Sequence, residues 1–110
     1  MNIEFNKKIK SAIDAVIPQA QVYTIYSSPT GFDDMEVVRV ITTAWKKLGK
    51  AERIAKVQNA VLPNLDPEEQ RRIFRFSVLT PNEWEEIQGH YAGEKPRRIG
   101  YRLKRHVAAG

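Results

Sequence analysis

Apolar residues recur every three or four positions in two long stretches of the chain, which is the spacing of one buried helix face. In residues 5–16 they lie among lysines, and this predicts an amphipathic first helix that Pro18 ends. In residues 51–61 the same spacing predicts a second helix, terminated by Pro63. The chain is therefore expected to bury two helices through one face each.

Two later segments carry the residues that start helices. Asp66 is followed by a proline and, three positions on, by Glu69, which predicts a brief capped helix. Thr80 and Glu83 have the spacing of a capping box around another proline. The second start predicts a last helix, which carries Trp84.

Three segments have the β-branched composition or the alternation of strands: residues 21–27, 35–43 and 72–79. Side chains two residues apart on a strand point to the same face. In the third segment this alternation places Phe74 and Phe76 together on the buried face.

The elements follow the order α-β-β-α-(α)-β-α, which predicts an α+β fold with a three-stranded sheet and the helices on one face. Residues 1–90 are expected to form a single α+β domain. Residues 91–110 are expected to form a basic C-terminal arm or an extra strand. The core is expected to contain Phe5, Ile9, Ile13, Val38, Val40, Val57, Val61, Phe74, Phe76 and Trp84.

The 110 residues carry a net charge of +5, and the whole excess lies in the tail. Residues 1–90 hold 12 basic and 12 acidic side chains, whereas residues 91–110 hold six basic ones and a single acid, Glu94. Clustered cations bind polyanions such as DNA or RNA by releasing counterions. The alternative is a solvated tail that only keeps the protein soluble.

The residue types limit the chemistry that the chain can perform. It has no cysteine and two histidines, His90 and His106, which excludes disulfides and thiolate chemistry and leaves little for histidine-based catalysis. No apolar run has the length of a transmembrane helix, and the N-terminus lacks the apolar stretch of a signal peptide. We therefore expect a cytoplasmic protein that is not an enzyme, with no cofactor, no metal and no membrane partner.

A second group of cations surrounds Gly49, which is predicted to close a turn in a left-handed conformation before a helix. Backbone amides and lysines at such a turn suit phosphate, and a solvated lysine face is the alternative. The predicted nucleic-acid-binding residues are Lys46, Lys47, Lys50, Arg53, Arg97, Arg98, Arg102, Lys104 and Arg105.

Several segments in this order resemble the BolA-like family, whose fold is related to the class II KH domain. They are residues 9–18, residues 37–42, Trp45, Arg53 and residues 76–84, the last reading Phe-Ser-Val-Leu-Thr-Pro-Asn-Glu-Trp. The resemblance covers residues 7–88. It implies a BolA/KH-like fold and a monothiol glutaredoxin as a partner, with which family members share an iron-sulfur cluster.

The chain departs from this family at the cluster ligands. The positions of the family's histidines hold Ile54 and Arg72 here, and the loop of residues 27–34 has neither cysteine nor histidine. Arginine has no available lone pair and cannot replace imidazole on iron. The resemblance therefore implies a divergent member without a cluster. Three hypotheses remain open. The charge distribution favours a small noncatalytic regulatory domain that binds nucleic acid or an acidic partner. The resemblance favours an adaptor for a monothiol glutaredoxin without cluster ligation. The third is an uncharacterised domain whose function the sequence does not indicate.

Overall fold

The computed structural model describes residues 3–31, 34–88 and 96–103. These residues form both helices and strands, and the predicted α+β class is confirmed. In chain order the elements are α1 (Ile3–Val16), β1 (Tyr23–Pro29), β2 (Glu36–Thr42), α2 (Lys50–Val61), a 3-10 turn (Leu62–Asn64), α3 (Pro67–Arg71), β3 (Ile73–Leu79), α4 (Pro81–Gln88) and β4 (Arg97–Arg102).

The sheet has four strands in the order β3-β2-β1-β4, so the prediction of three strands is wrong. β1 pairs antiparallel with both β2 and β4, and β2 pairs parallel with β3. The fourth strand comes from the basic tail. Without it β1 would leave a row of unpaired backbone groups at the edge of the sheet, and β4 satisfies them.

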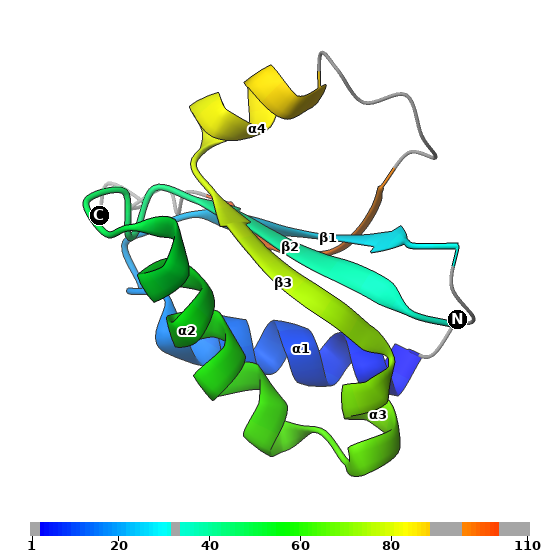
Figure 1. The fold of residues 1–110 in the computed structure, drawn as a ribbon. Coiled ribbons are helices and arrows are strands. Elements are labelled where there is room, and N and C mark those ends of the chain that lie inside the picture. The colour runs from blue at the N-terminus through cyan, green and yellow to red at the C-terminus, as the bar shows by residue number, and fades with distance from the viewer. Residues whose placement is uncertain (1–2, 32–33, 89–95, 104–110) are drawn as a thin grey trace.

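The helices lie on both faces of the sheet (Figure 1). α1 and α2 cover one face, while α4 lies on the opposite face. The prediction that all helices gather on one face is therefore wrong for α4. The reason is Trp84, which is buried against Ile41 and Leu79 on that face, in a small second core that Tyr26 flanks.

The main core lies between the sheet and the α1–α2 layer. Eight of the predicted core residues belong to it, and their burial confirms the helix and strand faces read from the sequence. They are Phe5, Ile9, Ile13, Val38, Val40, Val57, Val61 and Phe76. Trp84 is also buried, as predicted, but it belongs to the second core on the other face.

Phe74 is the one predicted core residue that the structure contradicts, because its side chain is 52% exposed. The β2–β3 ladder shifts register here: Glu36 pairs with Ile73, but the next residue, Val37, pairs with Arg75. Phe74 is thus the extra residue of a β-bulge. The bulge lets Ile73 and Phe76 both face the core, which strict alternation does not allow.

Both predicted helix starts are confirmed. Asp66 and Glu69 form a reciprocal capping box at α3. At α4 the backbone N–H of Thr80 donates to Glu83 Oε1 at 2.7 Å, and the N–H of Glu83 donates to Thr80 Oγ1 at 3.3 Å. These local bonds position α4 at the end of β3.

β4 packs closely on α1 at Gly100, which pairs with Ile25. A Cβ at Gly100 would lie 3.0 Å from Lys10 Cγ and 3.3 Å from Ile25 Cδ1. A Cβ there is in tighter contact than usual, so the side chain of Lys10 or Ile25 would have to give way by a few tenths of an ångström. The tail segment of residues 97–102 is therefore part of the packed fold.

Candidate nucleic-acid interface

Arg53, a predicted phosphate ligand, is 6% exposed and is committed to internal bonds. Its Nε donates to the carbonyl oxygens of Trp45 (3.1 Å) and Leu48 (3.0 Å), and its Nη2 donates to that of Lys46 (3.1 Å). These bonds hold the turn before α2. Gly49 is the N-cap of α2 with φ −66° and ψ 158°, so its predicted left-handed conformation is wrong.

The remaining donor of Arg53 fixes α4. Nη1 donates to Glu83 Oε1 at 2.7 Å, and the Nζ of Lys50 lies 3.9 Å from Glu83 Oε2. The backbone N–H of Thr80, followed by the hydrogen bond from Arg53, lowers the pKa of Glu83 to about 2. Arg53 and Glu83 therefore join α2 to α4 and do not form a ligand site.

Arg102 is also structural. Its Nη1 donates to the carbonyl oxygens of Ile17, Pro18 and Gln21 at 3.3, 2.8 and 3.1 Å. Its Nη2 bonds Asp14 through the carbonyl oxygen at 2.7 Å and through Oδ1 at 3.2 Å. Arg102 thus caps the carboxyl end of α1 and holds β4 to it.

The hydroxyl of Tyr23 donates to Asp14 Oδ1 at 2.6 Å, and the Arg102 guanidinium carbon lies 5.1 Å from the centre of the Tyr23 ring. The hydrogen bond from Tyr23 lowers the pKa of Asp14, while burial raises the pKa of Tyr23. This polar cluster lies between α1, β1 and β4. It anchors the fourth strand.

Five predicted binding residues are exposed and remain candidates: Lys46, Lys47, Lys50, Arg97 and Arg98. Lys46 and Lys47 lie in the turn before α2, and Lys50 is the first residue of α2. Arg98 pairs with Tyr26, on the α4 face, whereas Arg97 pairs with Ser27, on the other face. Lys104 and Arg105 lie outside the described residues.

A groove of about 610 Å³ runs between α4 and the strands β1 and β4. The ring centres of Tyr26 and Trp84, which both line it, lie 5.2 Å apart with 28° between the ring planes. Arg98 stands beside Tyr26 at one end. At the other end the lining residue Thr43 accepts a hydrogen bond from the backbone of Lys46. Two lining residues, Tyr26 and Thr43, are therefore backbone neighbours of Arg98 and Lys46, which the sequence placed far apart.

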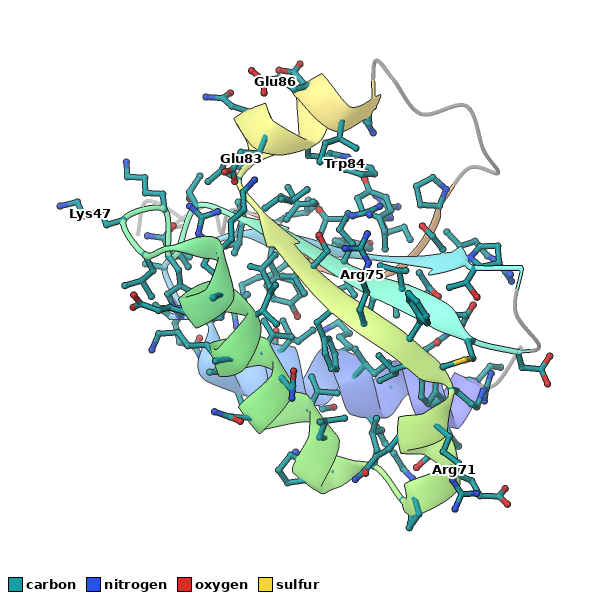
Figure 2. The ribbon with its side chains drawn as sticks, viewed as in Figure 1. Lys47, Arg71, Arg75, Glu83, Trp84 and Glu86 are labelled. Carbon is teal, nitrogen blue, oxygen red and sulfur yellow. The ribbon has the colours of Figure 1, made fainter. Side chains whose placement is uncertain are left out.

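The α4 face of the sheet carries two further arginines that the sequence analysis did not select. Arg39 on β2 is buried, with its guanidinium carbon 5.1 Å from the centre of the Trp84 ring. Arg75 on β3 is exposed. Figure 2 shows Trp84 on the sheet side of α4 and Glu86 on its outer side. The sequence does contain a sign of this site, because Arg39 is the single charged residue within the apolar run of residues 37–41. An arginine that is buried in such a run needs partners.

Within the described ranges, no group of three or more metal-ligating side chains comes together, and no helix has the length and apolar character needed to cross a membrane. Comparison of the chain with protein-family models, curated proteins and solved structures finds no match. The geometry of the α4 face is therefore the basis for a functional proposal.

Proposed function

We propose that the protein is a small noncatalytic cytoplasmic domain that binds single-stranded nucleic acid along the groove under α4. The observation that carries the proposal is the position of this aromatic groove between exposed cations, with Arg98 at one end and Lys46 near the other. A single strand has both exposed bases and charged phosphates, and it matches both features of the groove.

Each part of the groove has a chemical role in this proposal. The ring of Tyr26 is partly exposed at the groove and offers a surface on which an unpaired base stacks, while the buried Trp84 packs against it. The Arg98 guanidinium carbon lies 4.5 Å from the centre of the Tyr101 ring, a cation–π contact on β4. Lys46 and Lys47 supply mobile point charges for phosphates. Stacking and ion pairing together favour single strands over duplexes.

The test is fluorescence anisotropy of labelled single-stranded DNA and RNA oligonucleotides with the full chain at low salt. The paired variant Lys46→Gln and Lys47→Gln, and the single variant Arg98→Gln, are each expected to weaken binding about threefold to tenfold. The matched control replaces Lys7 and Lys56, which are exposed on α1 and α2, with glutamine. Binding that is absent at low salt, or equally weak in the control, would contradict the proposal.

The rival function is an adaptor for a monothiol glutaredoxin, and it rests on the resemblance to BolA-like proteins. This function requires stoichiometric association that tolerates salt. Nucleic-acid binding instead weakens steeply as salt increases. Titration of the same protein with a monothiol glutaredoxin and with oligonucleotides at two salt concentrations separates the two functions.

A further inference from the structure

Arg39 lies in the middle of the sheet, on the α4 face, and its side chain is only partly satisfied. The residue is 6% exposed, and its Nε donates to Ser77 Oγ over a long 3.4 Å. Its Nη1 is fully covered and has no hydrogen-bond partner among the described residues. Trp84 packs against the guanidinium, and an aromatic ring cannot neutralise its charge.

A buried arginine without an anion is costly, because guanidinium keeps its proton at any pH that a protein experiences. A second unsatisfied group lies close to it. Ser28 is 2% exposed, and its hydroxyl has no partner in the described part of the chain. Tyr26 pairs with Arg39 and Ser28 pairs with Val37, so Ser28 and Arg39 are diagonal neighbours on one face. Such neighbours are about 7–8 Å apart, within the reach of an arginine.

The surroundings of these two groups are positively charged. Arg75 pairs with Val37 on the next strand, shares the α4 face and is open to solvent. The described strand positions on this face contain no acid. They are Thr24, Tyr26, Ser28, Val37, Arg39, Ile41, Arg75, Ser77, Leu79, Arg98 and Tyr101.

The carboxylates of α4 do not supply the missing anion. Glu83 is bound to Arg53 and to the backbone of Thr80. Glu86 lies on the outer side of α4 (Figure 2), and Glu85 is exposed at the groove. Arg39, Arg75 and the Ser28 hydroxyl therefore share this face of the sheet, and among the described side chains none of them has a carboxylate partner.

We propose that Arg39, Ser28 and Arg75 form a site for a phosphate group. Arginine donates two parallel hydrogen bonds to phosphate oxygens, and the serine hydroxyl donates a third. The two guanidinium charges match a phosphate dianion better than a carboxylate. Arg75 lies at the solvent side, where an incoming anion meets it first. The site lies outside the residues that line the groove and does not depend on the proposed nucleic-acid function.

The experiment titrates inorganic phosphate into the full chain at constant ionic strength, with chloride as the balancing anion. Proton–nitrogen NMR follows the Arg39 Nε–H and the Trp84 indole N–H. We expect saturable shifts of both signals. Ser28→Ala and Arg75→Gln each remove one donor to a charged ligand, and we expect each to weaken binding about tenfold or more. The control is Arg71→Gln, because Arg71 is exposed on α3 and is expected to leave the affinity unchanged.

Arg39→Met is expected to abolish the phosphate-dependent shift of Trp84. If this variant does not fold, Ser28→Ala and Arg75→Gln decide the question. Shifts that never saturate, or that are the same in both of these variants as in the parent protein, would overturn the site. The groove variant Lys46→Gln with Lys47→Gln is expected to keep its affinity for inorganic phosphate, so a failed groove and a failed phosphate site give different results.

A second arm identifies the source of the phosphate. Inorganic phosphate that displaces a bound oligonucleotide assigns the site to a nucleic-acid backbone. Phosphate that binds together with the oligonucleotide assigns it to a free phosphate or phosphorylated small molecule. Both results support a phosphate site, and the absence of any phosphate binding contradicts it.

Discussion

Phe74 and Phe76 lie two residues apart on β3, yet one is 52% exposed and the other 5%. Phe76→Ala removes a large side chain from the main core, and we expect it to cost about 3–5 kcal/mol of unfolding free energy. Phe74→Ala changes a residue on the outside of the bulge and is expected to cost under about 1 kcal/mol. Urea denaturation of the two variants measures the difference. Equal losses of unfolding free energy in the two variants would contradict a bulge at Phe74.

Glu83 makes stability depend on pH. Its pKa is lowered from 4.5 to about 2 in the folded protein, so the ionised carboxylate stabilises the fold at pH values above 4.5. This contribution is lost as the pH falls from 4.5 towards 2. The Glu83→Gln variant has no carboxyl group to protonate at this position. The parent protein is therefore expected to be more stable than the variant at neutral pH and to lose this extra stability near pH 2. Thermal melts of both proteins across this pH range measure the difference in stability between them. A difference that does not change with pH would contradict the role given to the Glu83 carboxylate.

Among the elements, β4 depends on a single side chain for much of its attachment to α1. Arg102 donates to four backbone carbonyls at the end of that helix, so Arg102→Met leaves several acceptors without a partner. We expect a loss of about 1–3 kcal/mol. Hydrogen exchange is expected to become faster in β4 and at the β1 edge. Arg97→Met is the matched control, because Arg97 is exposed on the same strand and is expected to change stability by less than about 0.5 kcal/mol.

For the whole molecule, the separation of structural from exposed cations predicts the salt dependence of nucleic-acid binding. Arg53 and Arg102 are bound internally, which leaves Lys46, Lys47, Lys50 and Arg98 as the exposed cations of the predicted set that the proposal assigns to phosphates. About four phosphate contacts to a single strand correspond to a slope near −3 for the logarithm of affinity against the logarithm of salt. Anisotropy titrations at several salt concentrations measure the slope. A slope near zero would favour a protein partner.

The sequence by itself determined the local structure of this protein. Helix faces, the capping pairs at Asp66 and Thr80, and most of the main core follow from spacing and from hydrogen bonds within a few residues of the chain. These features depend on near neighbours, which the sequence displays directly.

Only the tertiary structure decided what joins distant segments. The bulge at Phe74 depends on the register between β2 and β3, and burial of Trp84 on the second face depends on its contact with Ile41. The roles of Arg53 and Arg102 depend on carbonyl groups that folding brings within reach. A charge in the sequence reveals its sign, but its partners are set by packing, and the partners determine whether an arginine holds the fold or remains free to bind a ligand.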